Sequence, residues 1–122
     1  MLPKLHDRVY RELLEALLEL QNLSIAPHID SPSLEKQYAL VKEIFNHRAL
    51  KLTEEGMDGA SASRWLSVQI EINRAVRLLQ NDLLFFRSAR QSSTRQTRLK
   101  TLCDRIEQLI GYCQVLLQEK EA

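Results

Sequence analysis

Residues 64–86 read RWLSVQIEINRAVRLLQNDLLFF, and this stretch decides the fold. Apolar residues recur along it at intervals of three and four, which places them on one face of an α-helix. This row consists of Trp65, Val68, Ile72, Ala75, Val76, Leu79, Leu83 and Phe86. A second apolar row consists of Leu66, Ile70, Leu78 and Phe85. A helix that is apolar over more than one face is central, so we expect it to contact neighbours on two sides.

Two earlier segments show the same helical period. The first begins at Pro3, which a first turn tolerates because its missing N–H would be unpaired there anyway. Its apolar row is Leu5, Val9, Leu13, Ala16, Leu17 and Leu20, and its acidic outer face is Glu12, Glu15 and Glu19. After a connection over residues 22–33, a second helix begins with Ser31 or Ser33 as its N-cap. Its apolar row is Leu34, Tyr38, Val41, Ile44, Phe45, Ala49 and Leu52. We expect this helix to end near Gly56, which suits a left-handed cap.

The long helix begins after Asp58 or Ser61, either of which can cap it, and its apolar row stops at Phe86. A polar interval over residues 87–98 follows, and the row then resumes as Leu99, Leu102, Ile106, Leu109, Ile110, Cys113, Leu116 and Leu117. The chain can turn near residues 92–94 and return as an antiparallel fourth helix. It can also continue as one helix, because no glycine or proline interrupts it. We favour the turn, since the resumed row needs a partner.

Four amphipathic segments predict an all-α fold, an up-and-down antiparallel four-helix bundle with a long third helix. The 122 residues form a single helical bundle domain, residues 1–122. At 1.5 Å per residue the third helix spans ~45 Å and the first ~30 Å, so the third and fourth should project beyond the others. We predict burial for Val9, Leu13, Leu17, Val41, Phe45, Ile72, Leu79, Leu83, Ile106 and Cys113.

The sequence contains no apolar run near the ~20 residues that cross a bilayer, and its first residues lack the apolar core of a signal peptide. We therefore expect a cytoplasmic protein without a membrane partner. Cys103 and Cys113 lie ten residues apart on one helix, ~15 Å along its axis, which is too far for a disulfide. We expect them to be small core residues. The tail Glu119–Ala122 should be frayed.

Catalytic and ligand-binding patterns are missing from the sequence. It has three glycines, too few for a phosphate-binding loop, and neither Cys-x-x-Cys nor His-Glu-x-x-His spacing. His47 is followed by Arg-Ala-Leu-Lys, unlike the small residues, lysine and glycine that follow the histidine of phosphotransfer domains. We predict that the protein is not an enzyme, takes no small-molecule substrate and holds no cofactor or metal.

Charge is the most distinctive property of the chain. Residues 1–60 contain seven Lys or Arg and ten Asp or Glu, which gives a net charge of −3. Residues 61–122 contain ten Lys or Arg and six Asp or Glu, which gives a net charge of +4. No acidic residue lies between Asp82 and Asp104, and the basic residues of that window are Arg87, Arg90, Arg95, Arg98 and Lys100. Arginine makes planar, bidentate contacts with carboxylates and phosphates. We predict that Arg87, Arg90, Arg95 and Arg98 bind a partner; the alternative is a solvated bundle end.

Residues 72–117 also carry a family resemblance. The segments Leu79–Gln91 (LQNDLLFFRSARQ), Thr97–Leu99 (TRL) and Gly111–Cys113 (GYC) follow the order found in the cyanobacterial heterocyst frequency control protein PatD family, which the chain resembles. Residues 1–60 match it only in length and helical character. The resemblance implies an all-helical regulatory protein that binds the cell-division protein FtsZ, modulates its assembly and so affects heterocyst frequency or cell division. It transfers no binding residue, so the arginines remain a physical inference.

Three hypotheses about function follow from these observations. The first is a non-enzymatic regulator whose partner is FtsZ, an acidic protein. The second is a helical adaptor for nucleic acid. The isoelectric point of about 7.8 and the small number of aromatic residues near the arginines argue against this hypothesis. The third is a subunit of a helical homo-oligomer, such as a homodimer, in which a second copy buries Leu84 and Phe85.

Overall fold

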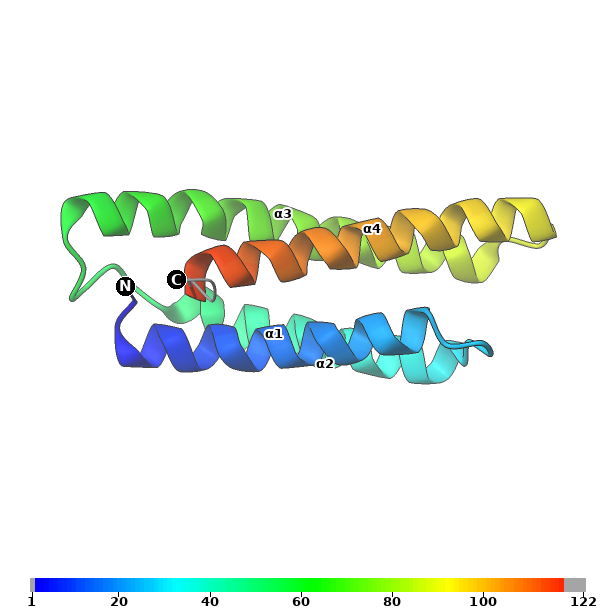
Figure 1. The fold of residues 1–122 in the computed structure, drawn as a ribbon, viewed down its shortest axis with the longest axis horizontal. Coiled ribbons are helices and arrows are strands. Elements are labelled where there is room, and N and C mark those ends of the chain that lie inside the picture. The colour runs from blue at the N-terminus through cyan, green and yellow to red at the C-terminus, as the bar shows by residue number, and fades with distance from the viewer. Residues whose placement is uncertain (1, 118–122) are drawn as a thin grey trace.

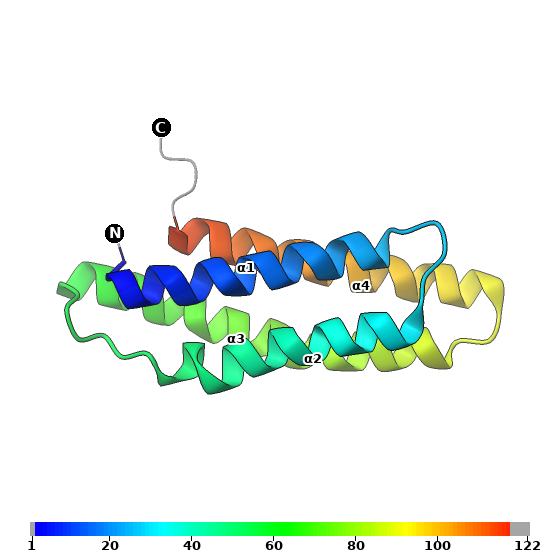
Figure 2. The same ribbon diagram turned by 90° about the horizontal axis from the view of Figure 1, so that it is seen from below.

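The computed structural model describes residues 2–117, and its regular elements are four α-helices and one short 3₁₀ helix. These are α1 (Lys4–Ser24), α2 (Ser31–His47), η1 (Ala49–Lys51), α3 (Gly59–Ser88) and α4 (Ser92–Leu117). Each helix runs antiparallel to the next (Figures 1 and 2), and the four form a ring in chain order, closed by contacts between α1 and α4. The predicted all-α four-helix bundle is confirmed, and α3 is its longest helix at 30 residues.

All ten positions that the sequence predicts to be buried lie in the core. Leu13, Leu17, Val41, Phe45, Ile72, Leu79, Ile106 and Cys113 are fully enclosed, and Val9 and Leu83 nearly so. They come from all four helices, so one continuous core runs through the ring. The recurrence of apolar residues at intervals of three and four therefore identifies the inward face of each helix correctly.

As predicted, α3 contacts neighbours on two sides, α2 and α4, but its second apolar row does not supply those contacts. Leu66, Ile70 and Phe85 are 41%, 61% and 48% exposed, and Leu78 is half-buried. In a four-membered ring each helix touches two neighbours with adjacent sides, and its outer side remains in solvent. Leu5, which was expected in the row of the first helix, is 56% exposed.

The second helix ends at His47, earlier than predicted. Ala49 is fully buried, and its carbonyl oxygen accepts hydrogen bonds from Gln69 Nε2 (2.9 Å) and from the backbone N–H of Leu52 (3.1 Å). These contacts hold the chain in η1 and end the α-helix. Gly56 has a positive φ of 87°, as predicted for a left-handed residue, but it lies in the loop before α3.

The N-caps of α2 and α3 are both aspartates. Asp30, rather than Ser31 or Ser33, caps α2 by accepting a hydrogen bond from the Ser33 N–H (3.1 Å). Asp58, one of the two predicted candidates, caps α3 by accepting from the Ser61 N–H (2.7 Å). That backbone hydrogen bond lowers the pKa of the Asp58 carboxyl, because it stabilises the ionised form.

The chain turns between α3 and α4, so the alternative of one continuous helix is wrong. The turn occupies residues 89–91, and residues 92–94, where we expected it, form the first turn of α4. The Arg95 N–H donates to the Gln91 carbonyl (2.9 Å), which begins the helix there. Further along the pair, Arg105 Nε of α4 donates to Asp82 Oδ2 of α3 at 2.8 Å. Asp82 is buried, so this ion pair fixes the register of the two helices.

A cluster of buried polar side chains lies where α1 and α3 begin, and we call His6, Tyr10, Trp65 and Gln69 the polar cluster. Trp65 Nε1 donates to the Tyr10 hydroxyl (2.8 Å), which in turn donates to Gln69 Oε1. His6 Nε2 lies 2.7 Å from the Thr53 carbonyl oxygen, and its ring meets the edge of Trp65 at 5.1 Å between centroids. Burial raises the pKa of Tyr10 well above its usual range, so the hydroxyl stays a donor.

The two cysteines lie on α4 and are both free. Cys113 is a core residue as predicted, whereas Cys103 is half-buried, with its Sγ 3.6 Å from Ser24 Oγ. The expected fraying of Glu119–Ala122 lies outside the described residues.

Candidate functional site

The four arginines that the sequence singles out are gathered where α3 ends and α4 begins. Arg87 lies in the last turn of α3, Arg90 in the connecting turn, and Arg95 and Arg98 in the first two turns of α4. We call these four residues the arginine tip. Figures 1 and 2 show that this end of the α3–α4 pair extends beyond the α1–α2 loop, as expected from the helix lengths. The tip is therefore accessible from several sides.

Two guanidinium groups of the tip stack on phenylalanine rings. The Arg95 Cζ lies 4.2 Å from the centroid of Phe86, and the Arg98 Cζ lies 4.7 Å from the centroid of Phe85. A guanidinium over an aromatic face is held flat by the cation–π attraction, while the N–H donors along its edge stay free to point outward. The stacking thus orients both arginines for planar contacts with a carboxylate or phosphate.

The other two arginines differ in how far they are engaged. Arg87 forms an ion pair with Glu35 of α2. Arg90 is exposed and makes no ion pair, side-chain hydrogen bond or ring contact with the described part of the chain. The tip therefore offers one unengaged arginine, two that are stacked, and one that an internal carboxylate already occupies.

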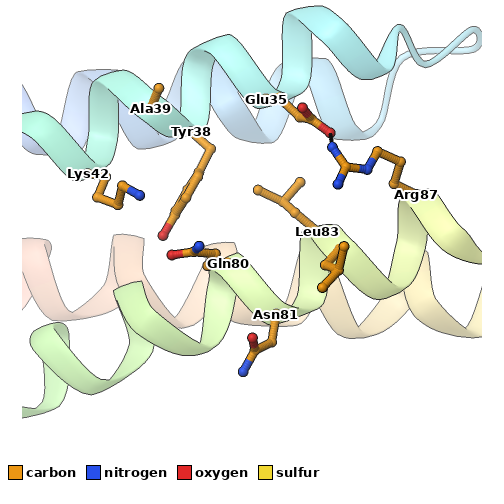
Figure 3. Close-up of a pocket in the computed structure, with 9 residues that line it drawn as sticks. Glu35, Tyr38, Ala39, Lys42, Gln80, Asn81, Leu83 and Arg87 are labelled. Atoms are coloured by element: carbon orange, nitrogen blue, oxygen red, sulfur yellow. Dashed lines mark hydrogen bonds and ion pairs between the residues drawn. The ribbon is translucent and has the colours of Figure 1, made fainter.

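A groove lies between α2 and α3, beside the arginine tip (Figure 3). The contact between these two helices is the smallest in the ring, and the groove has a volume of about 320 Å³. Tyr38 and Lys42 line it from α2, and Leu83 and Leu84 line it from α3. The Glu35–Arg87 ion pair closes its outer end, so Arg87 belongs to both the groove and the tip.

The amino-acid sequence does not indicate this groove, because the residues that line it do not form a motif. Tyr38 and Leu83 belong to the apolar rows and were assigned to the core, and Glu35 and Lys42 look like ordinary surface charges. The available signal was that Glu35, Tyr38 and Lys42 are spaced three and four apart, so they share one face of α2. Only the helix arrangement shows that this face borders α3.

Residues 2–117 contain no group of three or more histidine, cysteine, aspartate or glutamate side chains arranged to hold a metal ion. His47, whose following residues differ from those of phosphotransfer domains, is exposed at the end of α2. Among the described helices, none has an apolar stretch of the length that spanning a membrane requires.

Comparison of the chain with protein-family models, with curated proteins and with solved structures finds no match. The fold class is that of an all-α four-helix bundle, and bundles of this kind serve many unrelated functions. The function must therefore be argued from the arginine tip and the groove beside it.

Proposed function

We propose that this protein is a non-enzymatic regulator that binds FtsZ through the arginine tip and modulates FtsZ assembly in the cytoplasm. The resemblance of residues 72–117 to the PatD family supplies the partner, and the tip supplies a surface suited to it. The observation that carries the proposal is the stacking of Arg95 and Arg98 on Phe86 and Phe85, which keeps two cations oriented at an exposed end. Through FtsZ, the protein would affect cell division or heterocyst frequency.

The physical role of the tip is to speed encounter and to fix orientation. A basic surface attracts an acidic protein over about a Debye length, ~8–10 Å at physiological salt, and thereby raises the association rate. Once contact is made, charge-assisted hydrogen bonds from guanidinium groups to carboxylates define how the partner sits. Because the arginines are already held by stacking, little side-chain entropy is lost when they bind.

Reversing the charge of Arg90 and Arg98 tests the proposal. In co-sedimentation with purified FtsZ, the R90E/R98E variant should bind at least about tenfold more weakly, because two attractive contacts become repulsive. Its helicity and Tm should stay close to those of the unchanged protein, since exposed charges contribute little to stability. Raising the salt concentration should weaken binding of the unchanged protein in the same direction.

A matched control carries the same change in net charge far from the tip. Lys4 begins α1 and Lys51 ends η1, and both are exposed. The K4E/K51E variant should keep most of its FtsZ binding. Equal binding by R90E/R98E and the unchanged protein at low salt would reject the tip as the contact surface. Tight, steeply salt-dependent binding of duplex DNA without FtsZ binding would favour the nucleic-acid adaptor instead.

Self-association is the second candidate, and exposed apolar residues favour it. Leu66, Ile70 and Leu84 lie along the outer side of α3 and are 41%, 61% and 45% exposed. Apolar residues along one outer helix side are typical of helix-to-helix contacts between subunits. Sedimentation equilibrium over a hundredfold range of concentration should detect a homodimer, and an I70E substitution should dissociate it.

A further inference from the structure

The groove between α2 and α3 has an apolar floor. Leu83 and Tyr38 are buried beneath it, and the Tyr38 hydroxyl donates to the Val76 carbonyl (2.9 Å), so only the ring is presented. Leu84 adds an apolar side chain that is 45% exposed. A volume of about 320 Å³ lies at the lower end of the range of ligand sites in proteins, ~300–1,000 Å³, and has room for a few apolar side chains.

Two cations, Lys42 and Arg87, line the groove beside the amides Gln80 and Asn81. The Lys42 ammonium lies 5.7 Å from the centroid of the Tyr38 ring, and Arg87 stands at the outer end (Figure 3). Glu35 is the single carboxylate among the residues that line the groove, and it is paired with Arg87. Glu35 thus already provides a carboxylate for Arg87 at the outer end of the groove. An acidic segment of a partner could provide one carboxylate to Arg87 in place of Glu35 and a second carboxylate to Lys42.

We propose that this groove seats leucine-type side chains from an acidic segment of a partner protein. The partner's carboxylates pair with Lys42 and replace Glu35 at Arg87. Glu35 therefore acts as an internal competitor that the partner displaces. This inference rests on the proposed function, because Arg87 belongs to both surfaces and one partner segment would cross from the arginine tip into the groove. It adds an apolar contact that the tip does not provide.

A pair of synthetic peptides tests the groove without FtsZ. The first is a fluorescein-labelled peptide of repeating Asp-Asp-Leu (DDLDDLDDLDDL), and the second has serine in place of each leucine. By fluorescence anisotropy with the full chain, the leucine peptide should bind about tenfold more tightly, the gain expected from burying one leucine side chain. Equal affinity of the two peptides, or no binding of the leucine peptide up to millimolar concentration, would overturn the inference.

Two substitutions in the groove should shift the affinity of the leucine peptide in opposite directions. L84D places a charge on the apolar wall and should weaken binding about tenfold. E35Q removes the competing carboxylate and should tighten binding about two- to fivefold, the range of an exposed ion pair. The matched control for L84D is L40D: Leu40 lies on α2 and, like Leu84, is 45% exposed, but it does not line the groove.

The outcomes separate this inference from the proposed function. If L84D binds the peptide no differently from L40D, the groove is not the site. If E35Q leaves the affinity unchanged, Glu35 is not a competitor and the proposed displacement is wrong. If the peptide behaves as expected but FtsZ does not co-sediment, the groove stands and the proposed partner is wrong. If FtsZ binds, R90E/R98E abolishes binding and L84D leaves it unchanged, the arginine tip acts alone.

Discussion

The polar cluster and the arginine tip both combine aromatic rings with polar groups, at opposite ends of the bundle. In the polar cluster, Trp65 is 3% exposed and Tyr10 is fully buried, and their polar atoms hydrogen-bond to one another and to Gln69. His6 Nδ1 is the one buried side-chain N or O atom among the described residues without a hydrogen-bond partner. In the arginine tip, Phe85 is 48% exposed, and Arg98, whose guanidinium stacks on its ring, is exposed as well.

The difference shows which end can serve a partner. Apart from His6 Nδ1, the polar side chains of the cluster are satisfied within the protein, and a satisfied buried group has little left to offer a ligand. Such groups specify which helices meet and in what register. An exposed, oriented cation adds little to stability but retains its capacity for new hydrogen bonds. Substitutions in the polar cluster should therefore change stability, and substitutions in the tip should change binding.

Replacing Trp65 with alanine should give the largest effect. The substitution removes a buried ring and leaves the Tyr10 hydroxyl without its donor. We expect the free energy of unfolding to fall by about 3–5 kcal/mol, measured by urea denaturation at pH 7. The neighbouring L66A is the matched control, because Leu66 is 41% exposed, and it should change stability by less than about 0.5 kcal/mol. Similar losses for W65A and L66A would contradict the distinction between a buried and a solvent side of α3.

Alkaline pH should lower the free energy of unfolding through buried groups of the core and not through the arginine tip. Burial raises the pKa of the Cys113 thiol to about 12, from an ordinary value of 9.0. Above pH 9.0 the unfolded chain loses this proton while the folded chain keeps it, so stability falls as pH rises toward about 12. The slope from this one group is about 1.4 kcal/mol per pH unit.

Urea denaturation at pH 8, 10 and 11 measures this dependence. Burial likewise raises the pKa of Tyr38 to about 12, so some of the alkaline loss should persist in a C113A variant. The slope of that variant should nevertheless be shallower by the contribution of the single thiol. An unchanged slope in C113A would mean that the thiol is not protected in the folded state. The arginines of the tip stay charged throughout this range and contribute no slope.

Replacing Arg95 with methionine should change stability far less than the loss of Trp65 does. Methionine keeps an extended apolar side chain next to Phe86 but removes the cation–π contact, so the free energy of unfolding should fall by less than about 1 kcal/mol. FtsZ binding should weaken clearly in the same variant. A loss of stability above about 2 kcal/mol would show that Arg95 is a structural residue, and the contrast between the two ends of the bundle would then fail.

The inward faces of the helices could be predicted because hydrophobic periodicity reflects burial directly, as Ile72 and Leu79 illustrate. The outer apolar row of α3 was misassigned because periodicity cannot tell an inward row from an exposed one. The end of α2 was misplaced because it depends on Gln69, a residue 20 positions further along the chain than Ala49. No local pattern reports a contact of that kind.

The candidate site was predictable only where it depends on a local pattern of the sequence. The arginines stand out because acidic residues are missing from residues 83–103, and charge can be counted along the chain. Their stacking on Phe85 and Phe86 and the pairing of Arg87 with Glu35 require the position of the α3–α4 turn and the neighbourhood of α2. The groove is a property of two helices together, so neither sequence segment indicates it alone.

The ring order of the helices also bears on how the chain folds. Contacts between α1 and α2 and between α3 and α4 join segments linked by short connections, whereas α1 and α4 stand at the two ends of the chain and still pack side by side. Closing a long loop costs more conformational entropy than closing a short one. The two hairpins should therefore assemble first, and the docking of α4 onto α1 should limit the folding rate.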